Sequence, residues 1–485
     1  MSKATVPEEE PLLASLPVVE NGFQKSTDLL EFDHDNPKNW PNAYKWAIVF
    51  LLALMAFTVT FTCISIVPLA GGIVKELEHG APNPSASTLL VTIWELGEAV
   101  GPLLIAPLSE VIGRYPVMNG CNVLFVVATI FAGLSRSTSA LIAMRAFTGA
   151  AVASNVLNPA IIGDMFEAEH RGSAMSMVMF APLVGGAVGP AIGGLVAQTF
   201  GWRSVLFIGA GLAFICEVLF LTCFRETYAV AILRKRSREV RQNCVEYPVD
   251  GTEDHGDMEE LWLSITRPAA VLFSSWVLLI LSLFGAVQFS YFYVMSITMA
   301  DILQNMYGFS PALTGTAFLS FSIGSTIGVF ICHTTLDRIY IKLRGGQKAG
   351  IPEYRLPLSI IGAVFLPLSI VAYGWVAQLH LPVALLLLMV AFMGLTLLIT
   401  VIPLSAYVVD ACGAYSASAL TGVIVTRCLM GTFLPLTVNP LTHRFGYGWG
   451  FTCIGMGSLI LAPIPALIMR YGQKWRQRCE YTRSA

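Results

Sequence analysis

Residues 46–70, WAIVFLLALMAFTVTFTCISIVPLA, contain no charged side chain. A helix of about 20 mostly apolar residues crosses the hydrocarbon core of a bilayer, so this stretch predicts a transmembrane helix. The whole chain has the same character, because apolar residues make up 55% of its 485 residues, charged residues only 12%, and the mean hydropathy is +0.68. This composition lies outside the range of soluble domains and predicts a membrane protein.

Apolar stretches of this kind form two sets of six, with a polar segment between the sets. After 46–70, the first set continues through 87–108, 116–134, 139–163, 173–199 and 204–224, and the second comprises 270–297, 313–335, 357–377, 383–409, 417–440 and 448–470. We therefore expect an all-α membrane protein with twelve transmembrane helices in two six-helix bundles. The expected parts are a disordered cytosolic tail (1–45), an N-terminal bundle (46–224), a cytosolic linker (225–268), a C-terminal bundle (269–470) and a cytosolic C-terminal tail (471–485).

The positively charged residues predict the orientation of these helices. Cytosolic loops carry an excess of Lys and Arg. If the N-terminus is cytosolic, only four of the 29 Lys and Arg residues fall outside and two fall within helices, and all others face the cytosol. The four are Lys75, Arg136, Arg203 and Arg444, and the two are Arg145 and Arg427. Both termini are therefore expected in the cytosol.

Several classes of protein are excluded by what the sequence lacks. The ten cysteines lie mostly inside apolar stretches and the seven histidines have no ligand spacing, so we expect neither disulfides nor a metal site. The sequence contains no phosphate-binding loop, so an ATP-driven pump is not expected. It also contains no basic patch of the kind that binds nucleic acid. We find no His or Ser constellation for catalysis at the membrane surface, so an enzyme is not expected.

Two charged motifs lie in the first set. Between its second and third helices stands APLSEVIGRY (106–115), in which Gly113 permits a tight turn and Arg114 stays at the water boundary. Glu110 in this loop is expected to lie near a helix N-terminus across the two bundles, where the helix dipole stabilises negative charge. The fourth helix contains LIAMRAFTG (141–149); because Arg145 is costly to place in a membrane, we expect it to face protein or water.

The fifth helix carries a glycine motif, GGAVGPAIGG (185–194). Small residues every four positions let neighbouring helices approach closely, and a proline removes one helical hydrogen bond. The motif residues are Gly185, Gly189, Pro190, Gly193 and Gly194. Such a motif predicts close packing of this helix.

These motifs, in this order, resemble the major facilitator superfamily. Together with NPKNW (36–40), RETY (225–228), PEYRLP (352–357), YVVD (407–410) and SASAL (416–420), they are similar to the fungal twelve-helix branch of drug:proton antiporters over roughly residues 35 to 475. The resemblance implies two bundles that rock about a central substrate site, with the proton gradient in place of a cofactor. It also implies a gating role for Glu110, Gly113 and Arg114, and an exporter motif in the fifth helix.

Three acids lie well inside the expected helices: Glu95, Glu98 and Glu217. Glu95 and Glu98 share one helix face near the middle of the membrane. A carboxylate in a low-dielectric environment takes up a proton more readily than in water, and two close carboxylates disfavour double ionisation. We therefore expect Glu95 and Glu98, with Arg145, to couple transport to protons; in the alternative, the acids form a static ion pair with Arg145.

The expected substrate cavity contains Arg145, Arg427, Trp94 and Asn155. One arginine in each bundle suits an anionic substrate, because guanidinium groups bind carboxylates in a bidentate manner. In the alternative, Arg427 pairs with an acid or with backbone carbonyls and does not touch substrate. The acid pair departs from the usual pattern of the branch and is similar to that of citrate or itaconate exporters.

The expected function is export of a small organic compound across the plasma membrane by proton antiport and alternating access. The compound is an organic acid such as itaconate or citrate, or a secondary metabolite. The protein is expected to work as a monomer in the lipid bilayer. Two alternatives stay open: a broad multidrug or polyamine efflux pump, and a sensor that no longer transports.

Overall fold

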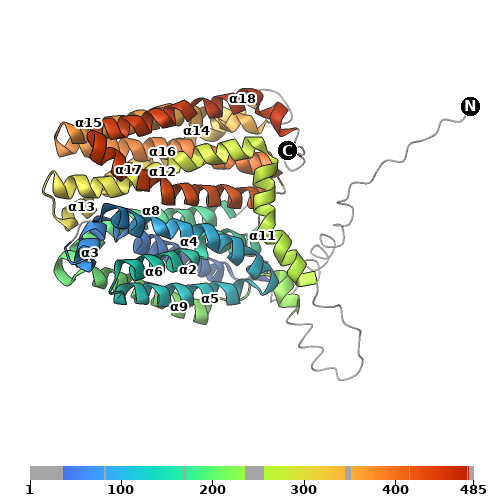
Figure 1. Ribbon diagram of the computed structural model, residues 1–485. Helices are drawn as coiled ribbons and strands as arrows, with labels where there is room; N and C mark the ends of the chain where they lie inside the picture. Colours follow the sequence, from blue (N-terminus) through green and yellow to red (C-terminus); the bar gives the residue numbers. More distant parts are fainter. Residues whose placement is uncertain are drawn as a thin grey trace, which may run out of the picture.

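Helices joined by short loops make up the part that the computed structural model describes, which is residues 36–80, 83–167, 171–234, 256–344, 351–413, 416–477 and 479. Figure 1 shows two layers of long helices running side by side, with the first half of the chain in one layer and the second half in the other. Residues 1–35 of the tail predicted to be disordered, and residues 235–255 of the predicted linker, lie outside the described residues.

The first layer, here called the N-half, consists of α2 to α9. These elements are α2 (Asn42–Ile64), η3 (Val67–Leu69), α3 (Ala70–Leu77), α4 (Pro84–Val111), α5 (Arg114–Leu134), α6 (Thr138–Ala150), α7 (Ser154–Met165), α8 (Arg171–Phe200) and α9 (Trp202–Cys223). A short 3-10 helix, η2 (Pro37–Asn39), precedes them.

The second layer, here called the C-half, consists of α12 to α18. These elements are α12 (Trp276–Asn305), α13 (Pro311–Ala317), α14 (Leu319–Arg344), η4 (Pro352–Arg355), α15 (Pro357–Gln378), α16 (Val383–Cys412), α17 (Ser416–Leu461) and α18 (Pro463–Arg476). The remaining helix, α11 (Gly256–Ser274), runs across the ends of both halves in Figure 1. We call this end of the molecule the α11 end and the opposite one the α3 end.

Eleven helical segments are long and apolar enough to cross a membrane. The last of them, Ser416–Arg476, has 61 residues, which at 1.5 Å per residue is about three times the thickness of a hydrocarbon core. It is broken at Gly446, whose φ of 74° and ψ of 172° are not helical. Two crossings therefore share this segment, and the predicted all-α fold with twelve helices is confirmed.

Several boundaries differ from those expected. The first helix begins at Asn42 rather than at 46, and the preceding Trp40 is buried, so ordered structure starts inside the predicted tail. Helix α11 occupies the last part of the predicted linker, and α18 continues to Arg476, past the expected end at 470. The predicted fourth helix, 139–163, is interrupted at residues 151–153 between α6 and α7.

The glycine motif of the fifth crossing packs α8 against α2. A Cβ atom at Gly185 would lie 2.8 Å from the Phe57 carbonyl oxygen, and one at Gly189 would lie 3.3 Å from that of Phe61. A Cβ atom at Gly193 would lie closer still to the Ser65 carbonyl oxygen. Because the contacts step four residues along both helices, only glycine allows the backbones to run this close together.

The same helix also contacts the C-half. Gly194 lies against the backbone of Pro311, and Gly315 on α13 lies against the backbone of Pro190. Neither position has room for a Cβ atom. The two halves are therefore in close backbone contact between α8 and α13, toward the α3 end.

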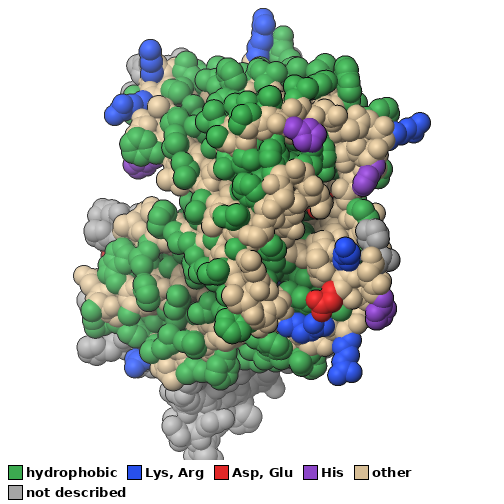
Figure 2. Space-filling model, turned by 90° about the vertical axis from the view of Figure 1, so that its left-hand side faces the viewer, with side chains coloured by type: hydrophobic (Ala, Val, Ile, Leu, Met, Phe, Trp, Pro, Cys, Tyr) green, Lys and Arg blue, Asp and Glu red, His purple; other side chains and the backbone are tan. Residues whose placement is uncertain are grey.

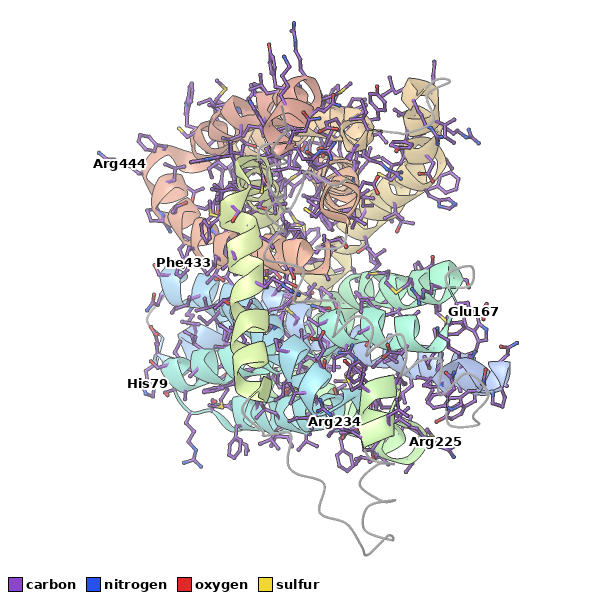
Figure 3. All side chains as sticks on the ribbon, turned by 90° about the vertical axis from the view of Figure 1, so that its right-hand side faces the viewer. His79, Glu167, Arg225, Arg234, Phe433 and Arg444 are labelled. Carbon is purple, nitrogen blue, oxygen red and sulfur yellow. The ribbon has the colours of Figure 1, made fainter. Side chains whose placement is uncertain are left out.

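Many large apolar side chains are exposed on the outside of both halves, as expected for a surface that faces lipid. Figure 2 shows the α3 end, on which Lys, Arg, Asp and Glu side chains are few and scattered among apolar ones. Figure 3 shows the α11 end, where Arg225 and Arg234 lie.

Candidate proton and substrate site

The two central acids lie on α4, the helix of the N-half that faces α17 and α12 of the C-half. Glu95 and Glu98 occupy the middle of α4, and only 3% and 7% of their surfaces are exposed. Gly97 and Gly149 let α4 and α6 approach backbone to backbone beside them. The two carboxylates therefore lie midway along α4, at the interface between the halves.

Glu95 is bound by a residue of the C-half. The hydroxyl of Tyr293, on α12, donates a hydrogen bond of 2.5 Å to its Oε1 atom. Its other oxygen, Oε2, is buried and accepts no hydrogen bond from the residues described. Glu95 thus holds the two halves together through one oxygen and has a second oxygen that is not hydrogen-bonded.

Glu98 is bound from both halves. Asn155, at the start of α7, donates a 2.6 Å hydrogen bond to Oε1, and the Arg427 guanidinium on α17 lies 3.6 Å from the same atom. Arg427 also stacks over the Phe289 ring at 4.4 Å. The side chain of Arg427 is 26% exposed, so it is the charged group of this cluster most accessible to a ligand.

Together these residues form a central cluster, which we define as Glu95, Glu98, Asn155, Phe289, Tyr293 and Arg427. The thiol of Cys428 adjoins it, with Sγ within 4.8 Å of a carboxylate oxygen of each glutamate. Glu95 and Glu98 each already bind a side chain of the C-half, so the groups form a hydrogen-bonded ion cluster rather than an open set of metal ligands. Chemically, the cluster places the Glu98 carboxylate against the Arg427 guanidinium, with the Glu95 carboxylate one helical turn away on α4.

Arg145 does not pair with either glutamate, which corrects one expectation. Its guanidinium donates to the backbone carbonyls of Thr62 and Cys63 at 3.1 and 2.8 Å and stacks on Trp94 at 4.7 Å. The last carbonyls of a helix lack intrahelical partners, and a cation near them is stabilised by the helix dipole. Arg145 therefore caps the end of α2, and because only 1% of it is exposed, it does not face an open cavity.

Trp94 also lies away from the expected cavity. It is 1% exposed and packs edge-on against Phe125 inside the N-half. Asn155, by contrast, is exposed and directed at Glu98. Of the four expected cavity residues, the structure therefore brings Asn155 and Arg427 together and leaves Trp94 and Arg145 in the core of the N-half.

The loop motif between α4 and α5 contributes to a second cluster, at the α11 end. Gly113 has a φ of 114°, in the region that favours glycine, and turns the chain directly into α5. Arg114 bonds Ser109, lies 3.6 Å from Asp164 and stacks over the Tyr228 ring. Burial raises the pKa of Tyr228, and the nearby negative charge of Glu110 raises it further.

The carboxylate at a helix N-terminus is Glu226 rather than Glu110. Glu226 accepts hydrogen bonds from the backbone N–H groups of Arg114 and Tyr115 at 2.9 and 3.0 Å, within the same half. Glu110 is exposed and forms no hydrogen bond or ion pair among the described residues. The RETY motif was noted in the sequence, but its partner was not, because the two segments are more than a hundred residues apart.

A matching cluster occupies the corresponding place in the C-half. Arg355, just before α15, binds Asp410 at 2.8 Å and Asp337 at 2.5 Å. Glu353 pairs with Arg476 of α18 at 3.4 Å. In both halves, an arginine that precedes or begins the third helix thus binds an acid near the end of the fourth.

The third acid inside the helices, Glu217, lies apart from the central cluster. It is on α9, 3% exposed, and neither of its oxygens has a hydrogen bond among the described residues. Its neighbours α5 and α2 belong to the N-half, so it does not reach the interface between the halves.

Comparison with known proteins agrees with this architecture. Residues 47–435 match the family model described as Major Facilitator Superfamily. The chain belongs to the major facilitator superfamily. It is a multi-pass membrane transporter of small molecules and not an enzyme.

Fungal transporters are among the relatives of this superfamily member. The MFS-type transporter penM of Penicillium rubens is 33% identical over 92% of this chain and 88% of its own length. The efflux pump radE of Floropilus chiversii is 31% identical over 92% of this chain and 83% of its own. A solved bacterial homologue of the lysosomal transporter Spinster, inward-facing and unoccupied, has a TM-score of 0.65 at 15% identity, covers 90% of this chain and 99% of its own, and shows the fold alone.

Proposed function

We propose that this protein exports a secondary metabolite in exchange for protons, with Glu95 and Glu98 as the coupling carboxylates. The observation that carries the proposal is that each of these N-half acids is bound by a C-half side chain, Tyr293 or Arg427, at a buried interface. Export is supported by the relative whose name is efflux pump and by the resemblance to antiporters.

Coupling follows from what a proton does to these contacts. An ionised Glu98 attracts Arg427, and an ionised Glu95 accepts a charge-assisted hydrogen bond from Tyr293. Protonation removes the negative charge and weakens both attractions, so the halves separate more easily at α4. When Glu95, Glu98 and Arg427 are all ionised, the central cluster carries a net charge of −1, and the uptake of one proton makes it neutral. Proton binding and the rocking of the halves are thereby linked.

In the proposed orientation, the protein lies in the plasma membrane with the α11 end facing the cytosol. The four basic residues expected outside, Lys75, Arg136, Arg203 and Arg444, all belong to loops or helix ends at the α3 end. Arg114, Arg355 and Arg476 cluster at the α11 end, which agrees with the excess of positive charge in cytosolic loops. With this orientation, Glu95 and Glu98 lie midway between the two faces.

The central cluster favours a largely apolar substrate over an organic acid. Arg145 is occupied by backbone carbonyls, and Arg427 is already paired with Glu98. An anionic substrate would have to compete with Glu98 for the Arg427 guanidinium, beside a second carboxylate. Phe289 and the neighbouring Phe292 supply aromatic surface instead.

The test uses full-length protein in sealed vesicles with an imposed pH gradient. Metabolites of a deletion strain and an overexpressing strain identify the exported compound, and its gradient-driven flux is then measured. We expect flux in wild-type vesicles that collapses with a protonophore. Flux that is insensitive to the pH gradient would remove proton antiport from the proposal.

A further inference from the structure

Helix α8 is in close contact with α13, but a groove separates it from the helix that follows, α14. Toward the α3 end, the chain around Gly194 on α8 touches α13, which leads directly into α14. Beside this contact, on the side of the α11 end, a groove of about 350 Å³ lies between residues 180–187 of α8 and the first residues, 319–327, of α14. The groove lies on the interface between the halves and within two helices that cross the membrane.

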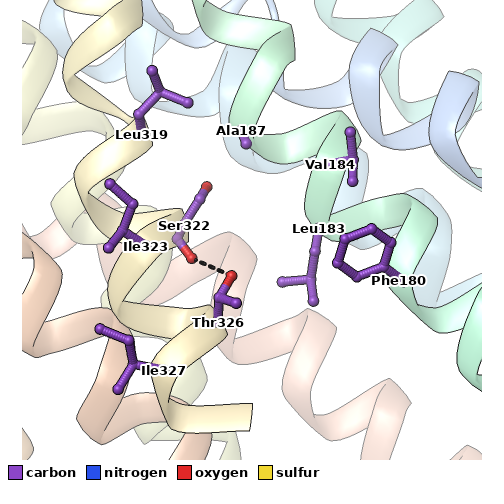
Figure 4. A pocket seen from close by; sticks show the side chains of 9 residues that line it. All are labelled: Phe180, Leu183, Val184, Ala187, Leu319, Ser322, Ile323, Thr326 and Ile327. Carbon is purple, nitrogen blue, oxygen red and sulfur yellow. Dashed lines mark hydrogen bonds between the residues drawn. The ribbon is translucent and has the colours of Figure 1, made fainter. Parts of the chain in front are cut away.

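The lining of this groove is apolar with two hydroxyl groups. It is formed by Phe180, Leu183, Val184, Ala187, Leu319, Ser322, Ile323, Thr326 and Ile327. Figure 4 shows Ser322 and Thr326 directed into the space between the helices, opposite Leu183. The Thr326 hydroxyl donates to the Ser322 carbonyl at 2.8 Å and keeps its own lone pairs available as acceptors.

The groove is connected to the central cluster by aromatic side chains. Phe321, next to Ser322 on α14, contacts Phe292 of α12 with ring centroids 5.0 Å apart. Phe292 in turn contacts Tyr293 at 5.1 Å, and Tyr293 binds Glu95. An apolar ligand in the groove is therefore separated from the proposed coupling carboxylates by three aromatic rings, of which Phe321 and Phe292 are half-buried and Tyr293 is buried.

We propose that the groove between α8 and α14 is a lateral entrance through which the substrate passes from the bilayer to the central cluster. Its occupant is the apolar part of a lipophilic compound that carries a hydroxyl or carbonyl group. The volume falls within the range of pockets for drug-sized ligands, about 300–1,000 Å³. This inference rests on the proposed export function, since it names the substrate class and its route.

The geometry explains why such a route suits an exporter of apolar compounds. A lipophilic compound concentrates in the bilayer, where the exposed Phe180 and Ile323 meet it at the mouth of the groove. The hydroxyl groups of Ser322 and Thr326 then bind the single polar group that would otherwise be unsatisfied in hydrocarbon. Entrance from the membrane does not require the compound to dissolve in water first.

The binding test uses a photoreactive diazirine derivative of dodecanol and full-length protein in phosphatidylcholine vesicles. Labelling is expected on peptides containing 180–187 and 319–327, and 4-heptyl-7-hydroxycoumarin should displace it. Ala187→Trp fills the groove and should lower the labelling several-fold. Leu195→Trp, on the same helix but exposed outside the groove, is the matched control and should not. Equal labelling in both variants, or labelling that the coumarin does not displace, would show bilayer lipid only and overturn the proposal.

A transport test separates the entrance from the export function. Vesicles are loaded with 4-methyl-7-hydroxycoumarin or its 4-heptyl analogue, which share the polar group and differ in the apolar chain. We expect Ala187→Trp to lower flux of the heptyl compound several-fold and to leave flux of the methyl compound unchanged. If both fluxes stay at the wild-type level, the entrance is wrong and export stands. If wild-type protein is labelled but moves neither compound, the export function fails for this chemistry and the groove remains a binding site.

Discussion

The Tyr293 hydroxyl lies 2.5 Å from the Oε1 atom of Glu95 and joins the C-half to the N-half near the midpoint of α4. Both residues are buried, with Tyr293 5% and Glu95 3% exposed. A buried carboxylate depends on such a donor, because leaving it without one costs the full desolvation penalty. The contact therefore ties the ionisation of Glu95 to the relative position of the two halves.

Removing this hydroxyl should uncouple the halves at Glu95. In Tyr293→Phe we expect export driven by a pH gradient to fall. We also expect the free energy of unfolding of the purified protein to drop by about 1–3 kcal/mol. Tyr291→Phe is the matched control, because the Tyr291 hydroxyl donates to the Ile454 carbonyl within the C-half. It should cost stability without changing the dependence of flux on the gradient; equal loss of gradient dependence in both variants would contradict the role of Tyr293.

The ion pair of Glu98 and Arg427 should show strong coupling between its members. Arg427→Gln leaves the Glu98 carboxylate without its cation and should destabilise the protein by up to about 3 kcal/mol. The double variant Glu98→Gln, Arg427→Gln removes both charges and should recover much of that stability, yet it should not recover proton-driven flux. A thermal denaturation series on the four proteins measures the coupling, and additive losses would mean that the pair contributes nothing.

Arg145 and Arg427 should differ in what their loss affects. Arg145→Lys replaces a planar group that spans two carbonyls by a point charge. We therefore expect the free energy of unfolding to fall by about 1–3 kcal/mol, and the apparent KM of the folded protein to change little. Arg427→Lys keeps the charge beside Glu98 but loses the stacking on Phe289, and should change the apparent KM. A raised KM in Arg145→Lys with unchanged stability would return Arg145 to the substrate cavity.

The contact between α8 and α2 should tolerate no side chain at Gly185. Gly185→Val places atoms against the Phe57 carbonyl and should destabilise the protein by about 1–3 kcal/mol through overpacking. At the neighbouring Gly186, a Cβ atom would meet the side chains of Ile64 at 3.6 Å and Thr60 at 3.9 Å, which are ordinary contacts. Gly186→Ala should therefore be neutral in a thermal-shift assay, and a similar loss in both variants would place the close contact elsewhere.

The start of α5 should depend on Glu226 and not on Glu110. Glu226→Gln weakens hydrogen bonds to the N–H groups of Arg114 and Tyr115, and we expect a loss of about 1–2 kcal/mol together with slower transport. Glu110→Gln changes an exposed acid in the same region and serves as the control. If Glu110→Gln proves the more harmful, the gating loop works through a partner that this conformation does not contain.

The fold was predictable because a bilayer imposes a simple rule on the sequence. Apolar stretches such as 46–70 and 383–409 have the length of a crossing, and helices α2 (to Ile64) and α16 occupy most or all of them. The break between α6 and α7 was not visible, since residues 151–153 are as apolar as their neighbours. The position of Asn155 opposite Glu98 depends on that break.

For the charged residues, the sequence predicted their location inside helices more easily than the groups that they bind. Sequence placed Glu95, Glu98, Arg145 and Arg427 inside helices, where an unpaired charge is costly. As the alternative to proton coupling, the sequence suggested Arg145 as the partner of the two glutamates. The structure instead satisfies Arg145 with backbone carbonyls at the end of α2, and such carbonyls leave no trace in a pattern of side chains.

The most direct measurement of proton coupling compares two kinds of flux through Glu95→Gln, Glu98→Gln and the double variant in sealed vesicles. Exchange of labelled for unlabelled substrate needs only alternating access, whereas accumulation against a gradient needs the proton. We predict that exchange persists in the variants while accumulation driven by the pH gradient, and the accompanying proton flux seen with a trapped pH dye, are lost. Wild-type accumulation and proton flux in the double variant would contradict the account.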